Sequence, residues 1–310
     1  MKVFVTGVSG QLGHDVMFEL VRRGHTAWGT ARRVPEELPT VTDDVKGLKT
    51  PISMFRTLEL TDEKAVKEEI ADLKPDAIIH CAAWTAVDAA EDPENRDAVF
   101  GANVLATRYL AEAAKTVGAK LLYLSTDYVF DGWGERPWQP DDKNYAPLNV
   151  YGQSKLGGEL AVAGVLEQYF IVRIAWVFGK SGKNFIKTML NVGKTHDTVR
   201  VVNDQIGTPT YTVDLARLLV DMIETNKYGY YHATNEGGFI SWYDFTREIY
   251  RQAGLNTKVI PVTTAEYGLS KAKRPFNSRL DKSKLMENGF APLPDWRDAL
   301  SRYLVEIGEL

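Results

Sequence analysis

Residues 2–13 read KVFVTGVSGQLG, and this stretch decides the fold class. Its first part, KVFVT, is β-branched and apolar enough for a buried strand. Gly7, Gly10 and Gly13 follow at once, and a helical pattern opens after them. Between a strand and a helix, such glycines allow a tight turn, the approach of a pyrophosphate and close packing of helix on strand. The stretch therefore predicts a dinucleotide site at a helix N-terminus rather than a glycine-rich turn without a ligand.

Short apolar runs alternate with helical patterns through the first two-thirds of the chain. The candidate strands are 2–6, 25–31, 55–60, 76–83, 120–126 and 169–175. Helical patterns between them cover 11–23, 62–73, 95–117 and 150–167. This alternation predicts an α/β fold with a doubly wound parallel sheet of the Rossmann type, helices on both faces, and a smaller α/β substrate-binding lobe.

The alternation weakens after about residue 176. Helical patterns then recur near 184–194, 211–225, 241–253 and 295–307. We expect a dinucleotide-binding domain over 1–176, to which 205–235 returns, and a substrate-binding lobe made of 177–204 and 236–310. Two proline-containing stretches, 33–52 and 131–149, are expected to be long loops, which in compact domains are usually functional or mobile.

The composition of the 310 residues is that of an ordinary globular protein, with 44% hydrophobic and 25% charged residues. The net charge of -4 gives no basic footprint, which argues against nucleic acid and anionic membrane as partners. Cys81 is the single cysteine, so no internal disulfide can form and a reducing, cytoplasmic location is expected. The apolar stretch at the start is too short for a signal peptide, and no run is long enough to span a membrane.

The end of the second predicted strand bears on the choice of cofactor. A site that prefers NAD has an acidic residue about 20 residues after the glycines, where its carboxylate binds the ribose hydroxyls. This chain has Thr30-Ala31-Arg32-Arg33 there. Two guanidinium groups can pair with a 2′-phosphate, so we expect NADPH and leave NADH open. The alternative is a solvated basic pair on a loop.

A carbonyl reductase needs a group that protonates the carbonyl oxygen, and a Tyr whose pKa is lowered by a nearby ammonium group can do this. Tyr151 and Lys155 are four residues apart on a predicted helix and so share one face. Tyr267 and Lys271 match the same spacing among Pro, Gly and Thr, and we interpret them as a chance match. Thr126 ends a predicted central strand, where doubly wound sheets bind ligands, and could hydrogen-bond Tyr151.

The glycine motif together with Thr126, Tyr151 and Lys155 resembles the extended short-chain dehydrogenase/reductase superfamily. Longer motifs narrow the resemblance to the dTDP-4-dehydrorhamnose reductase family. These motifs are STDYVFDG (125–132), PLNVYG (147–152), RIAWV (173–177), NDQIGTPT (203–210) and RPFNSRL (274–280). The likeness extends from residue 2 to about residue 300.

The resemblance implies NADPH-dependent reduction of the C4 ketone of dTDP-4-dehydro-L-rhamnose to dTDP-L-rhamnose. By position, Tyr151 is the proton donor, Lys155 holds the nicotinamide ribose and lowers the pKa of Tyr151, and Thr126 tunes Tyr151. The expected substrate contacts are Thr126, Asp127, Trp176 and Arg279. The expected cofactor contacts are Gly7, Gly10, Gln11, Leu12, Gly13, Arg32, Arg33, Leu60, Ala82, Ala83, Trp84, Tyr151 and Lys155.

Metal binding and assembly are not assigned. Some family members form a dimer around a divalent cation held by acidic residues, of which only Asp15 has a counterpart here. The five histidines and Cys81 show no ligand spacing, and a solvated helix acid explains Asp15. A homodimer is left open. Competing hypotheses are a sugar-nucleotide 4-ketoreductase of other stereochemistry, a non-catalytic NADP-binding regulatory subunit, and an epimerase or dehydratase of the same superfamily.

Overall fold

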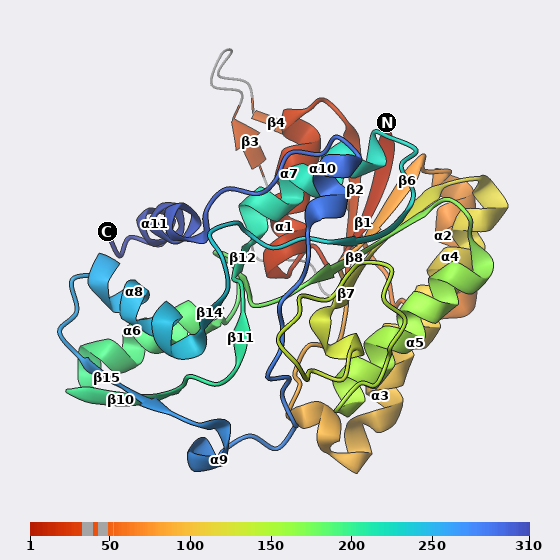
Figure 1. Cartoon of the computed structure of the whole chain (residues 1–310). Coiled ribbons are helices and arrows are strands. Elements are labelled where there is room, and N and C mark those ends of the chain that lie inside the picture. Colours follow the sequence, from red (N-terminus) through yellow and green to blue (C-terminus); the bar gives the residue numbers. More distant parts are fainter. Residues whose placement is uncertain (33–39, 43–48, 52) are drawn as a thin grey trace.

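A computed structural model describes residues 1–32, 40–42, 49–51 and 53–310. Its centre is a seven-stranded parallel sheet in the order β13-β8-β7-β6-β1-β2-β5 (Figure 1). The strands are β1 (Lys2–Thr6), β2 (Thr26–Ala31), β5 (Ser53–Thr57), β6 (Ala77–His80), β7 (Lys120–Thr126), β8 (Tyr169–Ile174) and β13 (Gly229–His232). The predicted doubly wound parallel sheet is therefore confirmed. β13 is an additional strand that no predicted run included.

The side chains of β1 show why helices must cover both faces of the sheet. Val3 and Val5 are buried in one core with α1 (Gln11–Arg22) and α7 (Thr212–Ile223). Phe4, between them, points into a second core with α2 (Glu63–Leu73) and α4 (Ala106–Val117), beside which α5 (Val150–Val165) packs. Each fully buried apolar side chain contributes about 1.5–3 kcal/mol, so a central strand of this kind is stable only between two helical layers.

A second lobe has a core of its own. The helices α6 (Phe185–Thr195), α8 (Trp242–Gln252) and α11 (Trp296–Glu306) pack around buried aromatic side chains, beside the parallel pair β10 (Thr198–Val202) and β15 (Lys258–Val262) (Figure 1). Short pairs join β9 (Val177–Phe178) to β12 (Thr210–Tyr211) and β11 (Ile206–Gly207) to β14 (Ile240–Ser241). The short helix α9 (Thr264–Tyr267) follows β15, whereas α10 (Ser283–Glu287) packs against β13 of the main sheet.

Two expected elements differ from the structure. The helix expected over 95–117 is interrupted, because a π-helical turn (Gly101–Leu105) separates α3 (Arg96–Phe100) from α4. The stretch 33–52, expected to be a loop, contains the antiparallel strands β3 (Thr40–Thr42) and β4 (Lys49–Pro51). Periodicity missed the π turn because one extra residue per turn hardly alters the apolar pattern. Strands of three residues are too short to give a clear alternation.

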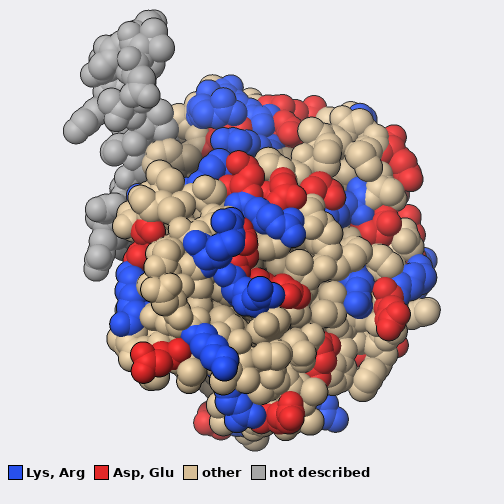
Figure 2. Space-filling view, turned by 60° about the vertical axis from the view of Figure 1, so that its left-hand side comes forward, with Lys and Arg blue, Asp and Glu red and all other residues tan. Residues whose placement is uncertain are grey.

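The surface carries charges of both signs. Figure 2 shows Lys and Arg side chains next to Asp and Glu side chains over the face that it presents. This mixture agrees with the small net charge of -4. Within the described residues, none of the helices combines the length and the apolar character that crossing a membrane requires.

Candidate active site

The predicted site residues come from loops at one edge of the sheet. The glycine loop follows β1, Arg32 follows β2 and Leu60 follows β5, while 82–84 follow β6. Thr126 ends β7 with Asp127 directly after it, and Trp176 follows β8. Because these strands are parallel, their carboxyl ends lie at the same edge, where doubly wound sheets bind ligands.

The glycine loop has the close backbone packing that a pyrophosphate site needs. Gly7 has a φ of +71°, and a Cβ atom there would lie 2.7 Å from the backbone nitrogen of Ala82. A Cβ atom on Gly13 would collide with the carbonyl oxygen of Gly7. Gly10 is the N-cap of α1 and brings no side chain to bond the first N–H groups of the helix. The loop therefore fits a dinucleotide, whose phosphates could accept hydrogen bonds from these N–H groups.

The loop after β6 is held by buried polar side chains that the sequence analysis did not single out. Asn103, in the π turn, accepts a hydrogen bond from the backbone N–H of Trp84 at 2.7 Å and donates to its carbonyl oxygen at 3.1 Å. The same amide donates to Ser154 Oγ at 2.8 Å, on the helix that carries Tyr151. Asn103 thus fixes the loop 82–84 relative to α5. A buried Asn in the apolar run GANVLA was the available signal for it.

The end of β2 carries no carboxylate in the described residues. The Thr30 hydroxyl is buried and donates to the carbonyl oxygen of Arg56 at 2.8 Å, so it is already used inside the sheet. Arg32 is exposed. Arg33, the other half of the predicted basic pair, lies outside the described residues.

Helix α5 presents Tyr151 and Lys155 on one face. The helix begins at Val150, and the Asn149 side chain caps it by accepting from the backbone N–H of Gly152 at 2.7 Å. Lys155 is buried, and its ammonium group lies 4.1 Å from the centre of the Tyr123 ring, a cation–π contact. These contacts hold the lysine on the inner side of the helix, next to the sheet.

Burial determines the ionisation of this group of residues. It lowers the pKa of Lys155 to about 7, although the negative charge of Glu159 acts in the opposite direction. It also raises the pKa of Tyr151, and the neighbouring charge of Asp127 adds to the increase. A hydrogen bond with Thr126 opposes the rise. The pKa of Tyr151 was expected to be lowered, but in this structure it is raised. Burial disfavours the phenolate more strongly than the hydrogen bond from Thr126 favours it.

Asp127 lies directly beside this group. Its side chain is buried, and its Oδ1 accepts a hydrogen bond from the Thr126 hydroxyl at 3.0 Å. Burial raises the pKa of Asp127 to about 6. Its Oδ2 is buried without a recorded hydrogen-bond partner in the described part of the chain. An acceptor in this position suits a ligand that brings hydroxyl groups.

Trp176 follows β8, the neighbour of β7, and has a strained backbone. Its φ is +51°, which is uncommon for a bulky residue, and its indole stacks on Trp242 with ring centres 3.7 Å apart. The side chain is partly exposed, so it is not simply a core aromatic residue. Strained residues of this kind cluster at ligand sites.

The second Tyr/Lys match lies elsewhere. Tyr267 ends the short helix α9 and is exposed, and Lys271 forms an ion pair with Asp92. Neither residue is at the end of a strand of the main sheet. The interpretation of this match as a coincidence of spacing agrees with these positions.

Asp15 is not the solvated acid that the sequence analysis expected. It is buried on the inner side of α1, where Oδ1 lies 3.2 Å from His14 Nδ1 and Oδ2 has no recorded partner. Position 15 falls on the buried stripe of α1 with Leu12, Val16 and Glu19, which explains the burial. Among the described residues, no group of three or more His, Cys, Asp and Glu side chains is placed to hold a metal ion.

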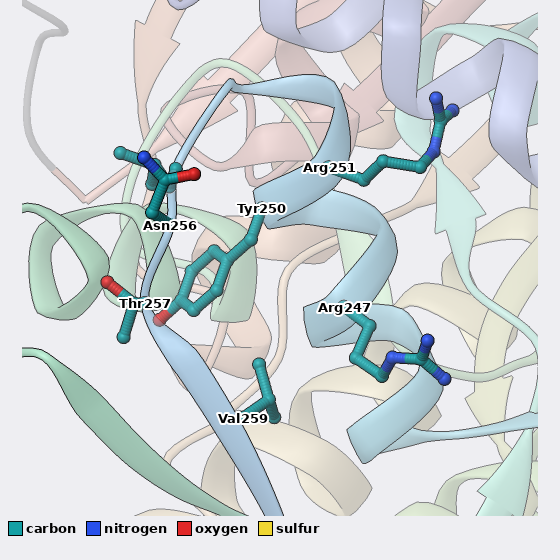
Figure 3. Close-up of a pocket in the computed structure, with 7 residues that line it drawn as sticks. Arg247, Tyr250, Arg251, Asn256, Thr257 and Val259 are labelled. Atoms are coloured by element: carbon teal, nitrogen blue, oxygen red, sulfur yellow. The ribbon is translucent and has the colours of Figure 1, made fainter.

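The described part of the surface includes two hollows. One, of about 340 Å³, includes Arg279, and the residues around it are Trp133, Gly134, Glu135, Asp204, Ile206 and Phe276. The other, of about 250 Å³, lies on the second lobe between α8 and β15, and Figure 3 shows Arg247 and Arg251 extending to the same side of it. Arg251 is already paired with Glu248, and no predicted site residue lines this second hollow.

Comparisons with known proteins agree with this geometry. Residues 1–308 match the family model described as the RmlD substrate binding domain. A dTDP-4-dehydrorhamnose reductase of Streptomyces griseus is 39% identical over 96% of this chain and 91% of its own. The spore coat polysaccharide biosynthesis protein SpsK of Bacillus subtilis is 34% identical over 98% of this chain and 97% of its own.

A solved structure gives the same result at the level of the fold. The dTDP-4-dehydrorhamnose reductase of Bacillus anthracis, crystallised in complex with NADP, superposes with a TM-score of 0.85 at 37% identity, covering 98% of this chain and 99% of its own. The resemblance derived from the sequence motifs is thereby confirmed. This chain belongs to the RmlD family, the family of the dTDP-4-dehydrorhamnose reductases.

Proposed function

We propose that this chain uses NADPH to reduce the C4 ketone of dTDP-4-dehydro-L-rhamnose, yielding dTDP-L-rhamnose for polysaccharide biosynthesis in the cytoplasm. The observation that carries the proposal is the group formed by Thr126, Asp127, Tyr151 and Lys155 at the carboxyl edge of the sheet, beside the glycine loop. Relatives named dTDP-4-dehydrorhamnose reductase support the choice of substrate.

The ionisation of these residues suits proton donation. The nicotinamide, when bound, supplies the hydride that the ketone carbon accepts. Tyr151 has a raised pKa and is therefore protonated at neutral pH, so it can give its phenolic proton to the C4 oxygen and complete the alcohol. A positive charge on Lys155 would favour the phenolate that remains. The Thr126 hydroxyl can hydrogen-bond this phenolate. Bulk solvent then returns a proton to Tyr151.

The cofactor would lie along the edge of the sheet. The residues that would hold it are the glycine loop, Leu60, the loop 82–84, Tyr151 and Lys155. Exposed Arg32 and its neighbour Arg33 favour NADPH over NADH, since a guanidinium group attracts a 2′-phosphate. The crystallised Bacillus anthracis relative, which is in complex with NADP, supports the same choice.

Contacts to the substrate would come from both lobes. Asp127 offers a buried acceptor for a sugar hydroxyl, and Trp176 offers a partly exposed aromatic ring. Arg279, at the edge of the 340 Å³ hollow, would hold the negatively charged diphosphate.

One relative favours a second candidate function. The dTDP-4-keto-6-deoxy-D-glucose reductase of Streptomyces niveus is 32% identical over 96% of this chain and 94% of its own. A reductase of that kind also acts on a C4 ketone of a dTDP-sugar. The same site could therefore reduce a 4-keto sugar of different ring stereochemistry.

Turnover with purified sugar nucleotides tests the proposal. Loss of NADPH absorbance is followed with dTDP-4-dehydro-L-rhamnose and, in parallel, with dTDP-4-dehydro-6-deoxy-D-glucose. We expect the first substrate to give the higher kcat/KM. A higher value for the second would establish the alternative, and oxidation with neither would contradict both.

A further inference from the structure

Trp133 is an unusual residue for a loop surface. Its side chain is 60% exposed, although an indole gains more than almost any other side chain from burial. Its neighbours Gly132 and Gly134 both have positive φ, at +71° and +83°. A Cβ atom on Gly132 would lie 2.5 Å from Pro275 Cβ, so the loop is pressed against the segment 274–279. The backbone thus holds the indole outward at a fixed place.

The place where Trp133 stands is the 340 Å³ hollow, whose volume lies within the usual range for small-molecule sites. Phe276 packs against the indole with ring centres 5.0 Å apart, and Ile206 adds a further apolar wall. Arg279 brings one positive charge, and Glu135 and Asp204 bring two carboxylates, of which Asp204 accepts hydrogen bonds from Thr264. An aromatic surface beside a guanidinium group suits a ligand with both a flat ring and a phosphate.

The buried side chain of Asn277 connects the loop of Trp133 with Arg279. Asn277 is 1% exposed, and its Oδ1 accepts a hydrogen bond from the Arg279 guanidinium at 3.1 Å. Its Nδ2 donates to the carbonyl oxygens of Trp133 at 3.3 Å and of Arg136 at 2.9 Å. The aromatic ring and the positive charge are therefore positioned by one side chain.

The hollow lies next to the candidate active site. The backbone N–H of Ser278 donates to the carbonyl oxygen of Ile206, which lines the hollow, at 2.8 Å. A Cβ atom on Gly207 would lie 3.0 Å both from Ser278 Cβ and from the Trp176 ring. The short strand β11 thus lies between the hollow and Trp176, one of the predicted sugar contacts.

From this geometry we propose that Trp133 is the platform on which the thymine of the sugar nucleotide stacks, with Arg279 holding the diphosphate between base and sugar. The proposal rests on the function proposed above and adds the residue that selects the nucleobase. Nucleobases stack on exposed aromatic side chains in this way, and a thymine N–H can donate to the Glu135 carboxylate.

Binding of dTDP and of pyrophosphate, measured by calorimetry at saturating NADP⁺, tests the assignment without requiring turnover. Trp133→Ala should raise the Kd for dTDP about 10-fold or more, and Trp133→Phe should restore most of the affinity. Pyrophosphate binding should be unchanged in Trp133→Ala and weakened in Arg279→Ala. Met286→Ala, which truncates an apolar side chain that is 59% exposed on α10, serves as the control and should bind both ligands normally.

The outcomes separate the inference from the function on which it rests. An unchanged Kd for dTDP in Trp133→Ala would show that the thymine does not stack on Trp133. The affinity of the wild type for dTDP would still support an enzyme that acts on dTDP-sugars. Equal losses for dTDP and pyrophosphate in that variant would also overturn the stacking on Trp133, since they indicate a displaced loop. A wild-type protein that binds no dTDP would contradict the proposed function itself.

Discussion

At the scale of single residues, the proposed chemistry depends on the phenol of Tyr151. Tyr151→Phe removes the hydroxyl and keeps the ring, so turnover should fall by about 10²-fold or more, as for loss of a general acid. NADPH binding should persist, because the ring and Lys155 remain. Steady-state kinetics and cofactor titration of both Tyr151→Phe and Tyr267→Phe measure this. Near-normal turnover in the first variant, or equal damage in the second, would show that the proton donor has been misassigned.

The proposed preference for NADPH depends on the basic pair Arg32-Arg33, which follows β2 in the sequence. Replacing Arg32 and Arg33 together by Glu should weaken NADPH binding by repulsion of its 2′-phosphate, whereas NADH binding should change less. The ratio of kcat/KM for the two cofactors is the measurement. A ratio that stays the same in the double variant would exclude a role for the pair, as would a wild-type preference for NADH.

At the scale of elements, the close contact of α5 with its neighbours positions Tyr151 and Lys155. A Cβ atom on Gly158 would collide with the Tyr123 hydroxyl and would lie 2.6 Å from the carbonyl oxygen of Asn103. Gly158→Ala should therefore lower the free energy of unfolding by about 1–3 kcal/mol and reduce kcat by displacing the helix. Gly164→Ala on the same helix is the control and should be neutral or stabilising, because its new methyl group would meet no described atom within 4 Å beyond its chain neighbours and its own helix backbone. Equal stability of the two variants in urea would refute the packing argument.

His80, which ends β6 between β1 and α4, should make the stability of the protein depend on pH. His80 is fully buried between Thr6, at 2.7 Å, and Thr107, at 3.1 Å, and burial lowers its pKa to about 3. Below the ordinary histidine pKa of about 6.5, His80 is protonated in the unfolded chain but stays neutral in the folded chain. His80 therefore lowers the free energy of unfolding as the pH falls from 6.5 towards 3. The buried Asp127 acts oppositely between about 3.9 and 6, because its folded pKa is raised. A comparison of His80→Gln with the wild type separates the effect of His80 from that of Asp127.

His80→Gln should therefore lose less thermal stability than the wild type between pH 6.5 and pH 4.5. His196→Gln replaces an exposed histidine and should follow the wild type over this range. Parallel melting curves for His80→Gln and the wild type would contradict a neutral, buried His80.

The sheet and its order of elements could be predicted because strands buried on both faces leave uninterrupted apolar runs, as in 120–126, which β7 matches residue for residue. β13 could not be predicted, because its sequence GYYH is short and partly polar. Only its neighbours in the fold bury it. The site residues at strand ends follow from motifs and from the geometry of parallel sheets. Asn103 and Trp133 could not be found in this way, because their roles depend on contacts between distant segments.

At the scale of the whole molecule, the C-terminal segment joins the two lobes across the site. Arg274 forms an ion pair with Asp88, from the loops after β6, at 2.7 Å. Asn149, at the start of α5, donates to the carbonyl oxygen of Lys273 at 2.7 Å. The same segment continues to Ser278 and Arg279 beside the hollow. One stretch of chain therefore holds the loops after β6, the start of α5 and the predicted substrate contact Arg279. The proposed transfer of a hydride and a proton to one carbonyl group requires such fixed positions.

The most direct test of this account follows the hydride to its destination. The protein is incubated with dTDP-4-dehydro-L-rhamnose and NADPH that carries deuterium on the transferable position, and the product is examined by NMR. The account predicts dTDP-L-rhamnose with deuterium at C4, formed by the wild type and lost in Tyr151→Phe. A product without deuterium at C4, or a Tyr151→Phe protein that forms the labelled sugar at the wild-type rate, would contradict it.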